Sequence, residues 1–162
     1  MKKTVIFGNS GSGKSTLAKN LCDLYQLAHL DLDILAWQAT NPPQRKPVDE
    51  SAITIKQFTE QNQQWIIEGC YTDLIALAIE QANEIIFLNP GIETCISNAK
   101  LRPWEPHKYE SPEAQEKNLG MLIDWIRDYE VREDEFSLKA HKQLYDSFLG
   151  RKTEYNSNQR QI

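Results

Sequence analysis

Four short apolar runs, most of them ended by glycine, proline or acidic residues, predict β-strands, and a fifth, polar segment is a candidate short edge strand. They cover Thr4 to Gly8, Ala28 to Leu32, Trp65 to Gly69, Glu84 to Asn89 and Lys152 to Tyr155. Apolar residues recur at helical spacing over Gly13 to Gln26, Val48 to Gln63, Thr72 to Ala82, Glu113 to Arg132 and Leu138 to Leu149. The alternation predicts an α/β fold in which helices cover both faces of a parallel sheet through right-handed crossovers. We expect the apolar stripes of the last two helices to pack on this sheet.

Two proline-rich stretches interrupt this pattern, Trp37 to Pro47 and Leu101 to Pro112. Each also carries basic residues. Loops of this length in a compact domain are usually functional lids or disordered segments. We therefore expect them to border a functional site.

One glycine-rich segment carries a specific chemical signal. It satisfies G-x-x-x-x-G-K-[ST] between the first strand and the first helix. Such a loop turns its N–H groups inward and forms an anion nest at the positive end of the helix. If the segment were only a turn that links strand to helix, a lysine buried against the start of the helix would be hard to explain. Lys14 adds a charge for β- and γ-phosphates, and the Ser15 hydroxyl can ligate Mg²⁺. The expected phosphate-binding residues are Gly8, Asn9, Ser10, Gly11, Ser12, Gly13, Lys14, Ser15 and Thr16.

Two other interpretations of these glycines fail. Gly11-x-Gly13 followed by Asp31 imitates a dinucleotide fingerprint, but Thr16 stands at the third glycine position. A hydrolase nucleophile elbow would need glycine where Ser12 stands.

Acidic residues lie at the ends of two predicted strands. Asp31 and Asp33 come at or just past the end of the second strand, and Glu68 comes near the end of the third. Ligands bind at this edge of an open parallel sheet, so each acid is a candidate base or ligand of metal-bound water. Asp33 also fits a helix N-cap, and Glu68 also fits an exposed strand end. We predict catalytic roles for Asp31 and Asp33 and a metal site formed by Ser15, Asp33 and Glu68.

Five cations follow the fourth strand and are candidates for stabilising a transferred phosphoryl group: Lys100, Arg102, Lys108, Arg127 and Arg132. Arg102 and Arg127 are the leading candidates among them for this role. Three aromatic residues in the two proline-rich loops either stack on a base or ring or pack their loops down: Trp37, Trp104 and Tyr109.

Composition narrows the class of protein. The 162 residues are 40% hydrophobic and 25% charged, which describes one ordinary globular domain. The net charge of -5 disfavours a general nucleic-acid-binding role. No apolar run approaches the roughly 20 residues that cross a bilayer, and the first one breaks at Gly8, so we expect a cytoplasmic protein that does not enter membranes. Three scattered cysteines, Cys22, Cys70 and Cys95, predict buried free thiols.

Together these segments resemble the small P-loop kinases of the adenylate kinase and shikimate kinase group. Asp31-Leu32-Asp33 is similar to the D-x-D element of shikimate kinases, and Arg102-Pro103 is similar to the start of their lid. Trp65 to Gly69, and Asp33 with Trp37, are also similar to adenylate-kinase-like proteins labelled DNA topology modulators. The three-glycine acceptor motif of shikimate kinases is absent.

The resemblance implies a single domain, 1–162, with the three-layer P-loop NTPase fold and a five-stranded parallel sheet in the order 2-3-1-4-5. Its core would comprise 1–33, 65–99 and 119–162. An acceptor-binding insertion would cover 34–64 and a lid 100–118.

Two functions follow as hypotheses. The first is transfer of the γ-phosphoryl group of Mg-ATP to a hydroxyl or phosphate of a small metabolite, in which Lys14 and Ser15 hold phosphate and Mg²⁺. Asp31 or Asp33 would position the acceptor, while Arg102 and Arg127 would neutralise charge. The second is a non-catalytic regulator that binds a nucleotide. A GTPase switch is disfavoured because no Asn-Lys-x-Asp segment occurs.

Overall fold

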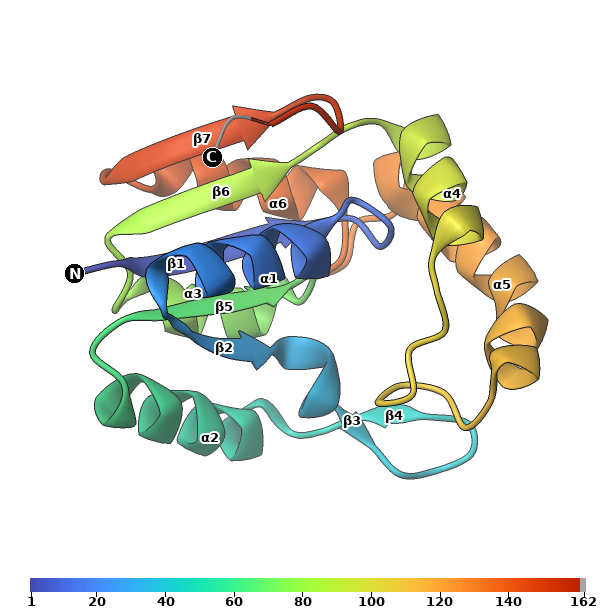
Figure 1. Ribbon diagram of the computed structural model, residues 1–162, viewed down its shortest axis with the longest axis horizontal. Coiled ribbons are helices and arrows are strands. Elements are labelled where there is room, and N and C mark those ends of the chain that lie inside the picture. Colours follow the sequence, from blue (N-terminus) through green and yellow to red (C-terminus); the bar gives the residue numbers. More distant parts are fainter. Residues whose placement is uncertain (161–162) are drawn as a thin grey trace.

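A five-stranded parallel sheet forms the centre of the computed structural model, which describes residues 1–160 (Figure 1). Its strands are β1 (Lys3–Gly8), β2 (Ala28–Asp31), β5 (Trp65–Gly69), β6 (Glu84–Leu88) and β7 (Arg151–Tyr155). They lie in the order β2-β5-β1-β6-β7, and all four neighbouring pairs are parallel. Counted in chain order these strands give 2-3-1-4-5, so the predicted α/β sheet is confirmed.

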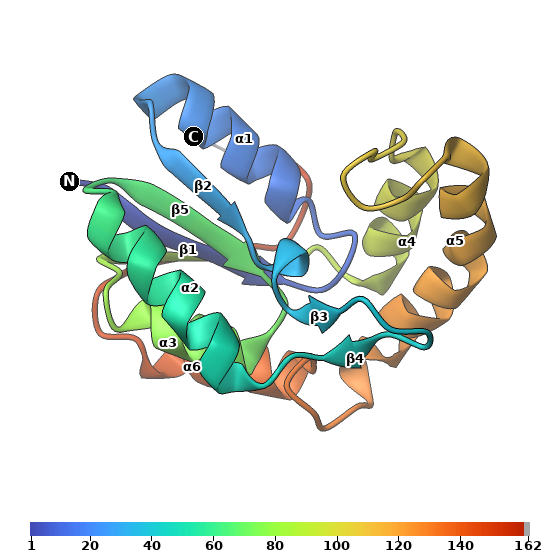
Figure 2. The same cartoon turned by 90° about the horizontal axis from the view of Figure 1, so that it is seen from below.

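Helices cover both faces of the sheet (Figure 2). One face packs on α1 (Lys14–Tyr25), and the other packs on α2 (Val48–Gln61), α3 (Thr72–Ile79) and α6 (Leu138–Ser147). Successive residues of β1 serve opposite faces: Ile6 joins the α1 side, whereas Val5 and Phe7 join the other. Both faces are therefore apolar, as the strand sequences predict. Within the described chain, no helix is both long and apolar enough to cross a membrane.

Two helices stand beyond the carboxyl ends of the strands (Figure 1). The first, α4 (Ile92–Leu101), was not predicted from the sequence pattern. The second, α5 (Pro112–Arg127), ends before a short 3₁₀ turn, η2 (Asp128–Glu130). The expectation that the apolar stripe of α5 packs on the sheet was wrong, because that stripe packs on α4. Their shared cluster contains Cys95, Ile96, Ala99 and Ile126, flanked by Ile92, Leu119, Leu122 and Ile123.

The first proline-rich stretch is more ordered than a loop. After a 3₁₀ turn, η1 (Leu32–Ile34), it forms a hairpin of β3 (Trp37–Gln38) and β4 (Gln44–Arg45). The Arg45 guanidinium lies 3.0 Å from Asp73, 3.1 Å from Glu135 and 4.9 Å from the Tyr71 ring centroid. These contacts attach the hairpin to α3 and to the segment before α6.

The three cysteines are free thiols. Cys70 and Cys95 are buried as predicted, whereas Cys22 is only partly buried. Burial raises the pKa of Cys70 to about 12 and that of Cys95 to about 11, so both stay protonated and unreactive at neutral pH.

Buried His141 makes the stability of this fold sensitive to acid. Its side chain donates through Nε2 to the Cys70 carbonyl at 2.9 Å and accepts at Nδ1 from the Tyr129 hydroxyl at 2.7 Å. Burial lowers the pKa of His141 to about 4 from an ordinary 6.5. The unfolded chain therefore takes up this proton first, and stability falls as pH drops from 6.5 towards 4, by up to about 3 kcal/mol.

We expect the free energy of unfolding, measured by urea denaturation between pH 8 and pH 4, to fall less steeply in His141→Gln than in the wild type. The matched control is His107→Gln, because the His107 side chain is 56% exposed. That variant should keep the wild-type slope, and an unchanged slope in His141→Gln would contradict the assignment.

Candidate functional site

The loop between β1 and α1 curls tightly and leaves the start of α1 without a side-chain cap. Gly11 has φ +77 and Gly13 has φ +94, a left-handed conformation that glycine adopts without strain. A Cβ on Gly11 would lie 2.4 Å from the Cys95 carbonyl oxygen, so α4 also needs glycine here. No side chain within the described chain caps α1 at Gly13. The uncapped N–H groups and the helix dipole make this a place that favours negative charge.

This loop opens into a cavity of about 440 Å³. Among the predicted residues, the wall includes Ser10, Gly11, Gly13, Lys14, Ser15, Thr16, Asp33, Glu68 and Arg102. The Lys14 ammonium donates to the Asn9 carbonyl oxygen at 2.7 Å and has no carboxylate partner in the described part of the chain. Its charge is therefore available to an anion in the cavity.

Ser15 and Glu68 come together at the base of this cavity, from α1 and β5. The Ser15 hydroxyl donates to Glu68 Oε1 at 2.9 Å. Glu68 is 1% exposed, and its Oε2 has no hydrogen-bond partner among residues 1–160. His29 Nε2 approaches this oxygen at 3.5 Å, outside hydrogen-bonding geometry. A buried carboxylate whose second oxygen has only this long contact to His29, beside a serine hydroxyl, fits a Mg²⁺ site completed by water and phosphate oxygens.

The two aspartates differ in position. Asp31 caps η1, because its Oδ1 accepts from the Asp33 backbone N–H at 2.9 Å. The N-cap considered for Asp33 is therefore provided by Asp31. The Asp33 side chain lines the cavity and accepts hydrogen bonds from the Tyr71 hydroxyl and from Lys108 Nζ. Asp33 is the aspartate that faces the cavity.

Lys108 sets the charge state of this acid cluster. Its ammonium lies 2.8 Å from Asp33, 3.3 Å from Asp31 and 3.6 Å from Glu105. Burial alone would raise the pKa of Asp33, but the ammonium and the hydrogen bonds from Lys108 and Tyr71 hold it below its ordinary value. Burial and the charges of Glu68 and Asp33 raise the pKa of Asp31. Burial opposes the charge of Lys108, yet the Asp33 and Asp31 carboxylates raise its pKa above the ordinary value.

The two favoured arginines lie in different places. Arg102 lines the cavity and donates to Glu105 at 3.2 Å. Arg127 is exposed and borders a separate surface hollow with Pro90 and Glu130. The structure thus does not bring Arg127 to the phosphate loop. The physical reason is helical phase, since Ile126 faces α4 and the next side chain points elsewhere.

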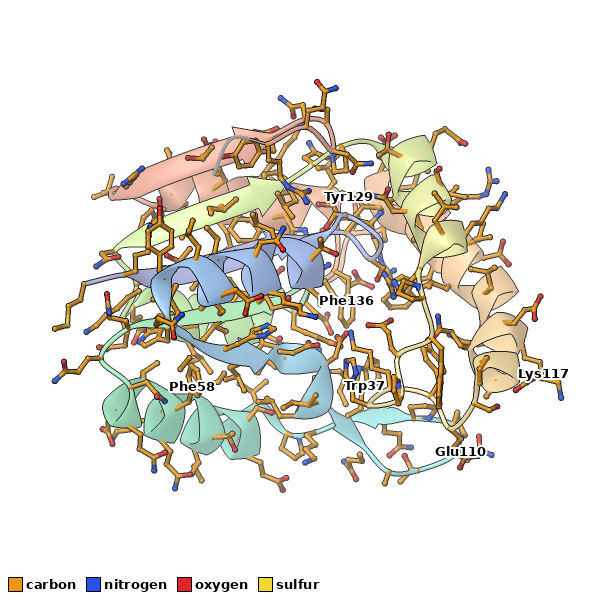
Figure 3. All side chains as sticks on the ribbon, viewed as in Figure 1. Trp37, Phe58, Glu110, Lys117, Tyr129 and Phe136 are labelled. Carbon is orange, nitrogen blue, oxygen red and sulfur yellow. The ribbon has the colours of Figure 1, made fainter. Side chains whose placement is uncertain are left out.

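Sequence reasoning missed several residues of this site, among them Glu105, which lines the cavity and pairs with Arg102 and Lys108. The Tyr71 hydroxyl donates to Asp33 and accepts from the Trp37 indole N–H at 2.8 Å. Of the two roles expected for Trp37, the contact with Tyr71 supports packing of its own loop. Trp37 also stacks on Phe136, with ring centroids 6.5 Å apart (Figure 3). Three others also line the cavity: Asn98, Asn158 and Arg160. No local pattern marks any of these residues, because distant elements bring them together.

The comparisons with known proteins do not assign a function to this site. No protein-family model and no curated protein matches the chain. Among solved structures, it is similar to a shikimate kinase from Acinetobacter baumannii in complex with shikimate. That likeness has 15% sequence identity and a TM-score of 0.43 over 89% of this chain and 92% of the other. A match this distant says nothing of substrate or activity here.

We expect Lys108→Met to raise the pKa of Asp33, because burial then acts without the opposing ammonium. Carboxyl chemical shifts followed by NMR during a pH titration would measure the change. Lys117→Met is the control, since Lys117 is exposed on α5 (Figure 3) and should leave Asp33 unchanged. An Asp33 titration curve that does not move in Lys108→Met would contradict the proposed charge coupling.

Proposed function

We propose that this protein binds Mg-ATP and transfers its γ-phosphoryl group to a hydroxyl of a small molecule. The observation that carries the proposal is the contact between Ser15, directly after Lys14, and the buried Glu68 carboxylate, inside the cavity that Asp33 also lines. The groups proposed to bind phosphate, the groups proposed to bind Mg²⁺ and the Asp33 carboxylate thus line the same cavity. Phosphoryl transfer needs positioning and charge stabilisation more than covalent chemistry from the protein.

Each group has a role in this proposal. The N–H groups at the start of α1 and the Lys14 ammonium would bind the β- and γ-phosphates. Ser15 and Glu68 would hold Mg²⁺, which supplies positive charge for the transferring group. Arg102 lines the same cavity from the end of α4, where its guanidinium pairs with Glu105.

Asp33 is the best-placed group for the acceptor. Its lowered pKa keeps it ionised at neutral pH, so it can accept a hydrogen bond from an acceptor hydroxyl. The acceptor oxygen would form the new bond to phosphorus while the bridging oxygen of ATP leaves with ADP, and the hydroxyl proton would pass to Asp33.

The charges around Asp33 favour a hydroxyl over a phosphate as acceptor. Lys108 is paired with Asp31 and Asp33, and Arg102 is paired with Glu105. Glu68 and Glu105 also line the cavity and add negative charge. Both cations that residues 1–160 place at this end of the cavity, Lys108 and Arg102, are thus already paired, which leaves a second phosphate group without a free one.

A nucleotide-binding regulator is the second candidate. The observation that favours it is the ion pair of Lys108 with Asp33, which occupies the carboxylate that an acceptor would need. In a regulator, a bound nucleotide would shift the loop that carries Lys108, and a partner would recognise that shift.

The two functions are separated by acceptor-dependent release of ADP. The assay supplies Mg-ATP and a panel of simple alcohols, polyols, gluconate, shikimate and nucleoside monophosphates. We expect release with a hydroxyl compound and a loss of at least about a hundredfold in Lys14→Ala, because an essential charge on the phosphates is gone. Lys19→Ala, exposed on the same helix, is the control and should retain activity.

Calorimetry with ATP and ADP at saturating Mg²⁺ accompanies the assay. Binding without acceptor-dependent release over the panel would favour the regulator. Full activity in Lys14→Ala, or no uptake of either nucleotide by folded protein, would refute the proposed site.

A further inference from the structure

Arg160, which lies outside the glycine-rich motif, covers the phosphate loop at the start of α1. A Cβ on Gly13 would lie 2.9 Å from Arg160 Nη1, 3.4 Å from Nη2 and 3.6 Å from Cζ. The guanidinium therefore contacts the backbone where the loop becomes helix.

A set of amide contacts fixes the segment that carries Arg160. Asn98 on α4 and Asn158 after β7 bond reciprocally through their side-chain amides, at 3.0 and 2.9 Å. The same Asn98 Nδ2 donates to the Gly11 carbonyl oxygen at 2.8 Å. The segment after β7 is thus attached to the phosphate loop through α4, and the position of Arg160 follows from this attachment.

Two of the six arginines of this chain, Arg127 and Arg160, have no carboxylate partner within residues 1–160, and of these Arg127 is exposed whereas Arg160 lines the cavity. Four others pair with carboxylates: Arg45 with Asp73 and Glu135, Arg102 with Glu105, Arg132 with Asp134 and Arg151 with Glu84. Arg160 has no carboxylate partner within residues 1–160, and burial lowers its pKa. It also faces the uncapped positive end of α1, in the cavity that Lys14 lines. Three positive features in one half-buried place repel one another unless an anion lies between them.

We propose that Arg160 binds the phosphate chain of a nucleoside di- or triphosphate, as a second cationic ligand beside Lys14. This inference rests on the proposed nucleotide site and adds a residue from the opposite end of the chain. A guanidinium provides a planar fork of N–H donors that suits phosphate oxygens. Bound phosphate would supply the missing counter-charge and hold the segment after β7, α4 and the loop together.

The test compares Arg160→Ala, Arg160→Lys and the wild type by calorimetry with Mg-ATP, Mg-ADP and inorganic tripolyphosphate. Arg151→Ala is the matched control, since Arg151 lies at the far end of β7 with its side chain 76% exposed. We expect Arg160→Ala to weaken binding of all three ligands about ten- to hundredfold, as for a lost charged hydrogen bond. Arg160→Lys should recover part of the affinity, and Arg151→Ala should bind as the wild type does. Thermal unfolding without ligand shows whether each variant is folded.

The outcomes distinguish this inference from the proposed function. Wild-type affinity for ATP in folded Arg160→Ala, together with lost binding in Lys14→Ala, would overturn the role of Arg160 and leave the nucleotide site standing. Weaker binding of ATP with unchanged binding of tripolyphosphate would also overturn it, because the contact would then be to the nucleoside. No binding of any ligand by the wild type would refute both.

Discussion

The register of three parallel strands decides where every candidate group of this site lies. Asp31 of β2 pairs with Glu68 of β5, and Glu68 pairs with Ile6 of β1. The last residues of β2, β5 and β1 therefore meet at one edge, where β1 runs into the phosphate loop. A slip of one residue in β5 would turn Glu68 to the opposite face and separate it from Ser15. The buried apolar residues on both faces oppose such a slip, so the sheet core also holds the site in place.

Charge is distributed unevenly over the cavity. At the Asp33 end, carboxylates and cations neutralise one another, with Lys108 between Asp31 and Asp33. At the loop end, Lys14 and Arg160 face the start of α1 without a carboxylate partner in residues 1–160. Only the loop end is thus incomplete without an anion. In the proposed nucleotide complex, this asymmetry would orient the substrate with its charged phosphate tail at the loop end of the cavity.

The parts predictable from sequence are those with local signals. The strands, most helices and the phosphate loop follow from hydrophobic period and glycine spacing, and Glu68 follows from its place at a strand end. The packing of α5 on α4 could not be predicted, because the apolar stripe of a helix does not specify which element it packs against. Arg127 was selected by residue type alone, and its helical phase turns it away from the loop. Arg160 and Tyr71 carry no motif, since only the tertiary fold brings them to Gly13 and Asp33.

The two walls around Asp33 differ in how firmly they are held. The β3–β4 hairpin is fixed by Arg45, which bonds Asp73 and Glu135 and lies against the Tyr71 and Phe136 rings. Tyr71 in turn joins Trp37 of this hairpin to Asp33. The facing loop after α4 reaches Asp33 through Lys108, whose charged partners come from both walls. A ligand that competes for Asp33 would break one of the two ion pairs that Lys108 makes with Asp31 and Asp33, whereas the hairpin keeps its Arg45 contacts. The hairpin wall would then set the shape of the acceptor pocket, and the loop would respond to its occupancy.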